Sequence, residues 1–143
     1  MPENAHTNIT FTHGIYSESL RIWQQNLNKS SDAQLDLLHR MKPGHVDVAV
    51  IQEPHINFLG NVQATTKWIT VYPTGHRDRP DRTRALTMIN KTSLSSNDWT
   101  QIDVDSPDIV AIRIRTGQGT LSIYNIYNDC TNDYSIDRLS DHL

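Results

Sequence analysis

The fold of this 143-residue chain is decided by residues 46–53, which read Val46-Asp47-Val48-Ala49-Val50-Ile51-Gln52-Glu53. Five of the seven residues from Val46 to Gln52 are apolar, four of them consecutive, without the alternation that marks a strand with one solvent-exposed face. A continuous apolar run of this length is typical of a strand that is covered on both faces, as in a parallel sheet. Pro54 follows directly and ends the run. The stretch therefore predicts the central strand of a layered α/β structure.

A strand and a helix are expected before this central strand. Residues Leu20–Gln25 form an apolar run that predicts the first strand, and a helix is expected from about Asp32 to Met41. Ser31 and Gln34 have the spacing of a capping box, which satisfies free backbone donors at a helix start. Pro43-Gly44 ends the helical pattern. Together with the elements that follow, the order strand, helix, strand is typical of a layered α/β sheet structure.

The remaining chain predicts further strands, a closing helix and a polar lead-in. We expect residues 1–19 to be disordered, because they are polar and show no periodicity. Residues 20–143 are expected to form one domain. Its further elements are short strands, an antiparallel hairpin and a terminal helix: Trp68–Tyr72, Ala85–Ile89, Trp99–Val104, Asp108–Arg115 with Thr120–Tyr127, and Asn132–Leu143.

Composition excludes several classes of protein. The net charge is −3, which argues against a general polyanion binder, and the mean hydropathy is −0.55. A single cysteine, Cys130, cannot form an internal disulfide framework and fits a reducing compartment. No signal-peptide pattern and no run of membrane-spanning length occurs. We therefore expect an intracellular protein, cytoplasmic or nuclear, that is not secreted and has no membrane partner.

Three of the apolar runs end on polar residues that could carry chemistry, namely Asn26, Glu53 and Tyr127. Enzymes of the α/β class build their sites at strand ends, where distant parts of the chain converge. A carboxylate such as Glu53 is a good ligand for Mg²⁺, and the Tyr127 hydroxyl could donate to a phosphate oxygen. Asn26 and Asn28, two residues apart, would point the same way on an extended chain.

Each of these residues also has an ordinary interpretation. Glu53 could be a solvated carboxylate at a strand–loop junction, and Tyr127 a half-buried aromatic residue at a strand end. Asn26 and Asn28 could serve in a turn by bonding the local backbone. The joint placement of all three at strand ends favours a site.

An arginine-rich segment lies between the expected strands, with Arg77, Arg79, Arg82 and Arg84. Such a loop could bind a nucleic-acid backbone. Two aspartates interrupt it and halve its net charge, so that a simple solvated loop is equally compatible with the pattern. The sequence has no glycine-rich phosphate loop, serine nucleophile elbow or zinc-type His/Cys spacing.

Three segments together resemble the endonuclease/exonuclease/phosphatase superfamily, which includes DNase I. They are Gln25-Asn26-Leu27-Asn28, Ile51-Gln52-Glu53-Pro54-His55 and Tyr124-Asn125-Ile126-Tyr127-Asn128. Their wording and order are most similar to the endonuclease domains of non-LTR retrotransposons. Residues Arg84–Asn90 also resemble the family's apolar strand between the second and third motifs.

The resemblance implies a four-layer α/β/β/α sandwich of the DNase I type and an endonuclease that hydrolyses DNA with Mg²⁺ or Mn²⁺. It implies that Glu53 is the metal ligand with Asn28 near the metal. By the same resemblance, Asn26 and Tyr127 would contact the scissile phosphate.

The family's Gly-Asp-Phe-Asn motif does not occur in the sequence. Ser140-Asp141-His142 has the letters of the terminal motif, but it lies too close to Tyr127 and in a helical pattern. We therefore expect an N-terminal portion of the domain, incomplete at its C-terminus and poorly active alone. The expected partners are DNA and the remainder of the domain or a reverse transcriptase of the same polyprotein. Alternatives are a degenerate non-catalytic fragment, a nucleic-acid-binding remnant, or a related enzyme of lipid phosphodiesters.

Overall fold

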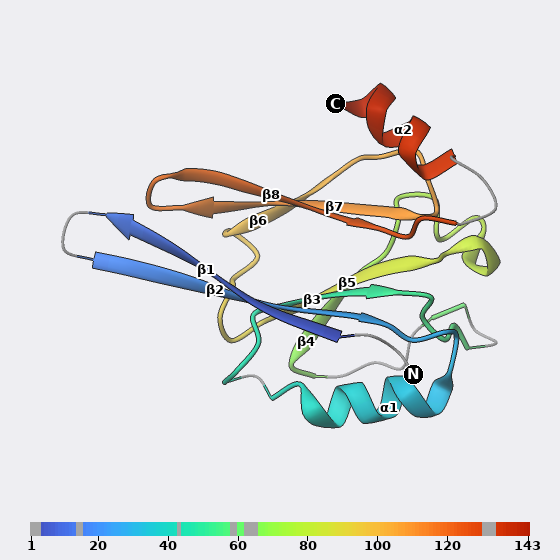
Figure 1. The fold of residues 1–143 in the computed structure, drawn as a ribbon, viewed down its shortest axis with the longest axis horizontal. Coiled ribbons are helices and arrows are strands. Elements are labelled where there is room, and N and C mark those ends of the chain that lie inside the picture. Colours follow the sequence, from blue (N-terminus) through green and yellow to red (C-terminus); the bar gives the residue numbers. More distant parts are fainter. Residues whose placement is uncertain (1–3, 14–15, 43, 58–59, 62–65, 130–133) are drawn as a thin grey trace.

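The computed structural model describes the chain except residues 1–3, 14–15, 43, 58–59, 62–65 and 130–133. The described part is a mixed α/β structure with two sheets and few helices, which confirms the predicted fold class at this level (Figure 1). The elements are β1 (Asn4–His13), β2 (Tyr16–Asn26), α1 (Ser31–Arg40), β3 (Val48–Gln52), β4 (Trp68–Val71), the 3₁₀ turn η1 (Pro80–Arg82), β5 (Ala85–Asn90), β6 (Trp99–Ile102), β7 (Ile109–Thr116), β8 (Gly119–Ile126) and α2 (Tyr134–His142).

The larger sheet has the strand order β1-β2-β3-β5-β4. Strand β3 lies at its centre with every residue buried, as the apolar run predicted. It runs parallel to β2, with Asn26 opposite Gln52, and antiparallel to β5. The predicted order strand, helix, strand is confirmed, and the parallel pairing places the ends of β2 and β3 side by side.

Helix α1 packs on one face of this sheet, and the smaller sheet β6-β7-β8 packs on the other. Leu37 of α1 joins Ile51 and Leu86 in the first core. The second core lies between the sheets, where Val50 of β3 and Ile112 of β7 are buried together. The face of the smaller sheet that turns away from β3 carries α2, whose Leu139 packs on a third cluster.

The structure differs from the expectation that residues 1–19 are disordered. Residues Asn4–His13 form β1, which pairs antiparallel with an extended β2 that already begins at Tyr16. The segment is an edge strand, and the side chains of its residues 5–10 are exposed except that of Ile9, which packs against the core between the sheets. Backbone pairing with an apolar neighbour orders a strand that has little apolar surface of its own.

Helix α1 begins differently from the predicted capping box. Its N-cap is Ser30, whose Oγ accepts a hydrogen bond from the Ala33 backbone at 3.1 Å. Gln34 is buried and bonds the backbone of His55 instead, at 2.9 Å through Oε1 and 3.3 Å through Nε2. The glutamine side chain is used to hold the segment after β3 against the helix.

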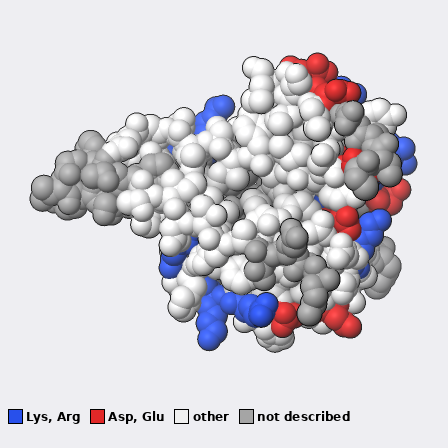
Figure 2. All heavy atoms as spheres, in the orientation of Figure 1, with Lys and Arg blue, Asp and Glu red and all other residues white. Residues whose placement is uncertain are grey.

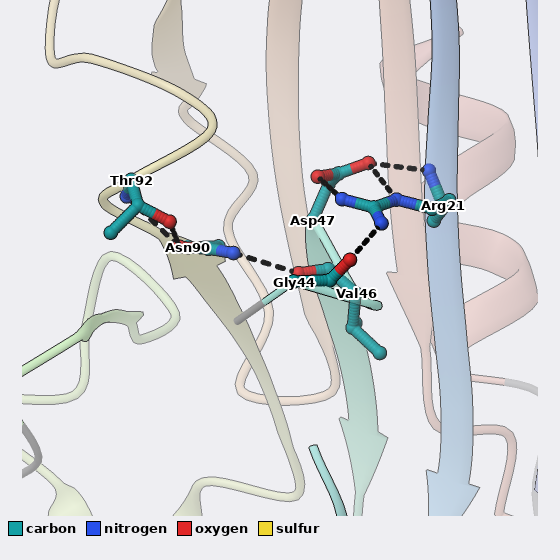
Figure 3. A network of polar contacts seen from close by, with 6 residues as sticks. All are labelled: Arg21, Gly44, Val46, Asp47, Asn90 and Thr92. Atoms are coloured by element: carbon teal, nitrogen blue, oxygen red, sulfur yellow. Dashed lines mark hydrogen bonds and ion pairs between the residues drawn. The ribbon is translucent and has the colours of Figure 1, made fainter. Parts of the chain in front are cut away.

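A network of polar contacts closes the end of β3 at which the strand begins (Figure 3). Arg21 binds Asp47 through Nε and Nη2, at 3.1 and 2.8 Å, and its Nη1 also donates to the Gly44 carbonyl. Asn90, at the end of β5, donates to the Val46 carbonyl at 2.9 Å. These contacts tie β2, β3 and β5 together far from the strand ends that carry the candidate residues.

No helix in the described part of the chain is long and apolar enough to cross a membrane. Ser140-Asp141-His142 lies within α2, as the helical pattern predicted. Cys130 lies outside the described residues.

Candidate functional site

The candidate residues Asn26 and Glu53 lie next to each other at the ends of β2 and β3. The backbone continues the strand pairing beyond both strands, because Leu27 N–H donates to the Gln52 carbonyl at 3.0 Å and Lys29 N–H to the Glu53 carbonyl at 2.8 Å. The parallel arrangement of the two strands brings these residues to one edge of the sheet.

Tyr127 reaches the same edge from the other sheet. The Tyr127 hydroxyl interacts with the Glu53 carboxylate, and this contact contributes to the raised pKa of the phenol. Backbone bonds run alongside this contact: Glu53 N–H donates to the Arg84 carbonyl at 2.8 Å, and Tyr127 N–H to the Asp108 carbonyl at 2.8 Å. The structure thus brings together Asn26, Glu53 and Tyr127, whose catalytic roles stay predictions.

The backbone is strained at this edge. Asn28, Lys29 and Glu53 have φ values of 50°, 60° and 48°, a region that residues other than glycine adopt at a cost. Asn26 Oδ1 accepts a hydrogen bond from Asn28 N–H at 2.9 Å, which is the turn chemistry that asparagine favours. Asn28 is exposed in this left-handed turn, so the two asparagines do not share one face of an extended strand as predicted.

The environment of Tyr127 keeps its hydroxyl protonated. Burial raises the pKa of Tyr127, and so do the hydrogen bond to Glu53 and the negative charges of Glu53 and Asp129, while Arg84 acts in the opposite direction. Since the phenol is the only proton donor of the pair when Glu53 is ionised, the hydroxyl donates to the carboxylate. The pair can therefore present a proton donor beside a carboxylate at one point of the edge.

Arg84 holds the two sheets together beside this pair. Its Nε and Nη2 bind Asp108 at 2.7 and 2.8 Å, and its Nη1 binds Asp129 at 2.8 Å. The hydrogen bonds with Asp108 and Asp129 raise the pKa of the Arg84 guanidinium, against the lowering effect of burial. Ser135 of α2 lies within 3.0 Å of Asp108 Oδ2. In the sequence Arg84 belongs to the arginine-rich segment, but it stands directly before β5 and Asp108 directly before β7, and these positions are the signal for the contact.

A second contact missed by the sequence analysis lies directly beneath the site. The Asn125 side chain of β8 crosses to the larger sheet, where Nδ2 donates to the carbonyls of Leu86 at 2.7 Å and Ile51 at 3.1 Å. Its Oδ1 accepts from Gln52 Nε2 at 2.6 Å, and Gln52 in turn accepts from Gln24. Asn125 and Gln52 are both buried, and we call this contact the Asn125 clasp. It fixes the residues next to Glu53 and Tyr127.

The arginine segment separates into two parts. Arg77, Arg79 and Arg82 are exposed, and Arg79 makes a loose ion pair with Asp81 at 3.7 Å. Acidic and basic side chains lie intermixed at the end of the molecule opposite the β1–β2 hairpin (Figure 2). Asp78 and Asp81 are also exposed in this segment, so that the three exposed arginines do not form a purely basic surface.

His76 anchors the arginine segment from below. It is buried, stacks on Tyr72 with ring centroids 4.0 Å apart, and contacts the Gly60 carbonyl through Nε2 at 2.6 Å and Thr83 Oγ1 through Nδ1 at 2.5 Å. Because a carbonyl can only accept, Nε2 carries the proton. The loop that presents the arginines is thus held in one conformation.

An open groove of about 970 Å³ runs beside the site between the arginine segment and α2. Its lining includes Lys29, Arg82, Asp108 and Tyr134. Among the residues that the structure describes, no cluster of three or more His, Cys, Asp or Glu side chains could hold a metal.

Comparison with known proteins supports the fold at the level of structure alone. No family model matches the sequence, and no curated protein matches it. The fold is similar to a solved structure described as the endonuclease domain of TRAS1, a telomere-specific non-LTR retrotransposon. The TM-score is 0.65 with 17% sequence identity over 85% of this chain, and the match spans 51% of that structure, so that this chain covers about half of its length. This is the type of protein that the three motifs resemble.

Proposed function

We propose that this edge is a metal-dependent phosphodiesterase site of the endonuclease type, and that its substrate is DNA. The observation that carries the proposal is the convergence of Glu53 and Tyr127 from the strand ends of two different sheets, with Glu53 in a left-handed backbone conformation. Residues held in such unfavourable backbone conformations cluster at functional sites. The fold's similarity to a retrotransposon endonuclease domain supports the same function.

The proposal includes the finer features that the family resemblance implies. The architecture would be the four-layer sandwich, and the protein would act in the cytoplasm or nucleus. The remainder of such a domain, or a reverse transcriptase, would be its protein partner. Hydrolysis by residues 1–143 alone would be slow, because mutually dependent catalytic groups lose their effect when some are missing.

The donor atoms present at the edge fit a hard cation. Glu53 offers a carboxylate and Asn28 an exposed amide oxygen, while Mg²⁺ is commonly held by one or two carboxylates with water and phosphate oxygens. Mg²⁺ or Mn²⁺ bound there would polarise the phosphoryl oxygen and stabilise the leaving oxygen. Softer metals are not favoured by this oxygen set.

The chain's own residues would bind and orient the phosphodiester. Asn26 uses Oδ1 in the local turn, which leaves its Nδ2 group as the donor for a phosphate oxygen. The Tyr127 hydroxyl keeps its proton and could exchange its Glu53 acceptor for a phosphate oxygen as negative charge develops there. Both donors are fixed by the backbone bonds described above, so little reorganisation is needed.

The test combines metal binding with cleavage. Mn²⁺ added to ¹⁵N-labelled protein should broaden the amide signals of the residues around Glu53, and Glu53→Gln should remove this effect while exposed Asp103→Asn retains it. Supercoiled plasmid should be nicked slowly with Mg²⁺, and both Glu53→Gln and Tyr127→Phe should abolish that rate. Identical Mn²⁺ broadening in wild-type protein and Glu53→Gln would contradict the proposal.

Binding without hydrolysis is the second candidate, favoured by the exposure of Arg77, Arg79 and Arg82. If these three contact phosphates, log K for duplex DNA should fall with log salt with a slope of about −2 to −3. Replacing all three by glutamine should flatten the slope, with Arg113→Gln on β7 as the exposed control. Equal slopes for both proteins would argue against this surface. We leave Arg84 out of the set because Asp108 and Asp129 already bind it.

A further inference from the structure

We propose that Arg84 is the positioning residue of this site: it holds the Tyr127 ring in the place where its hydroxyl meets Glu53. The inference deepens the proposed function and rests on it only for the effect on cleavage. Arg84 contacts both Glu53 and Tyr127. Its backbone carbonyl accepts the Glu53 N–H at 2.8 Å, and its guanidinium carbon lies 4.8 Å from the centre of the Tyr127 ring.

The guanidinium is itself fixed in three directions. Two parallel bonds to Asp108 set the plane of the fork, and the third nitrogen reaches Asp129, two residues after Tyr127. Asp108 in turn receives the Tyr127 backbone N–H through its carbonyl. Three contacts therefore hold the segment that carries Tyr127 against Arg84: the backbone bond of Tyr127 to Asp108, the packing of the Tyr127 ring on the guanidinium, and the ion pair of Asp129.

These contacts indicate that Arg84 positions Tyr127 beside Glu53 and does not bind a phosphate. Two carboxylates offset the single positive charge, and the Asp108 side chain is only 4% exposed, so a phosphate would have to displace a buried, doubly bonded partner. A planar fork can make the two bonds to Asp108 and the third to Asp129 at once, whereas a lysine ammonium cannot reproduce that geometry. The chemistry explains why arginine stands at this position.

The chain contains a matched control for this contact. Arg21 binds Asp47 through the same two-bonded fork at the far end of β2 and β3 (Figure 3). The arginine side chains are 32% and 29% exposed, and their aspartates 6% and 4%, for Arg21 and Arg84 respectively. Arg21→Lys therefore disturbs an equivalent ion pair without touching the site.

The experiment measures the contact between Tyr127 and Glu53 directly. Protein labelled with ¹³Cζ-tyrosine gives five signals, and Tyr127→Phe assigns the one that matters. Glu53→Gln should shift this signal in the wild-type background and equally in Arg21→Lys. In Arg84→Lys the shift should be lost, because the ring is no longer held against the carboxylate. Asp129→Asn, which removes one ion pair but keeps the arginine, should weaken it and serves if Arg84→Lys does not fold.

Cleavage provides the second measurement. Arg84→Lys should lower kcat for Mg²⁺-dependent nicking by about 10- to 100-fold with little change in KM, as expected for a misplaced donor. If wild-type protein does not nick DNA but the ¹³C result holds, the proposed function fails and the positioning role stands. An undiminished ¹³C shift in both Arg84→Lys and Asp129→Asn would overturn the role of Arg84.

Discussion

Replacing Asn125 by alanine should reveal how strongly the two sheets depend on the Asn125 clasp. Asn125 is only 2% exposed, and its two shortest bonds join Gln52 at 2.6 Å and the Leu86 carbonyl at 2.7 Å. Asn125→Ala leaves both buried partners without it. A buried polar group that loses its partner costs about 1–3 kcal/mol, so we expect the free energy of unfolding to fall by about 3 kcal/mol. For a chain of this size that corresponds to a decrease of about 10 °C in Tm.

Urea unfolding followed by tryptophan fluorescence measures this loss, with Asn97→Ala as the control because Asn97 is exposed. The control should change the unfolding free energy by less than about 0.5 kcal/mol. Asn125→Asp sharpens the result. The new carboxylate faces the carbonyls of Leu86 and Ile51, so the pKa of this carboxyl group should be raised. The stability of the variant should therefore recover as the pH falls. If Asn125→Ala loses no more stability than Asn97→Ala, the clasp does not hold the sheets together.

Three further changes test the scaffold. Burial on its own would raise the pKa of Asp47, but hydrogen bonds from Arg21 lower this pKa below its ordinary 3.8. The ion pair therefore stabilises the protein above that pH, and its contribution is lost on acidification. Asp47→Asn should cost about 1–2 kcal/mol at pH 7 and flatten the stability profile between pH 5 and pH 2 in urea titrations. Gly60→Ala should lower the unfolding free energy by about 1–2 kcal/mol in thermal melts, because Gly60 has a φ of +80° and an added Cβ would lie 3.0 Å from Pro80; an unchanged Tm would contradict this. Ser30→Ala should cost about 1 kcal/mol through loss of the N-cap, while an equal effect from Ser31→Ala would indicate the other cap.

The strands of the core could be predicted from sequence because each has enough apolar residues to show its period. The buried run before Glu53 and the alternation of β7 both correspond to strands in the structure. Strand β1 could not be found this way, since its order comes from pairing with β2 and not from its own apolar content. The helix start was misplaced by one residue because Ser30 and Ser31 are both good N-caps, and Gln34 has a tertiary partner that no local pattern reveals.

The candidate site was foreseen where it depends on strand ends and missed where it depends on contacts between sheets. Parallel pairing of β2 and β3 is enough to bring Asn26 beside Glu53. The contacts of Arg84 and Asn125 each join segments that are 24 or more residues apart and belong to different sheets. Such contacts follow from the packing of one sheet on the other, which the periodicity of a single segment does not encode.

Backbone hydrogen bonds restrict the motions of the site, and they are donated by the amides of Lys29, Glu53, Arg84 and Tyr127. These amides lie outside regular strands, where hydrogen exchange is usually fast, yet each donates to a carbonyl of a neighbouring strand end. To expose the Lys29 or Glu53 amide to solvent, the edges of β2, β3 and β5 must separate, and to expose the Tyr127 amide, the paired ends of β7 and β8 must separate. We therefore expect their hydrogen-exchange protection to approach that of the central strand β3, so that the site opens only in the cooperative unit that unfolds the core.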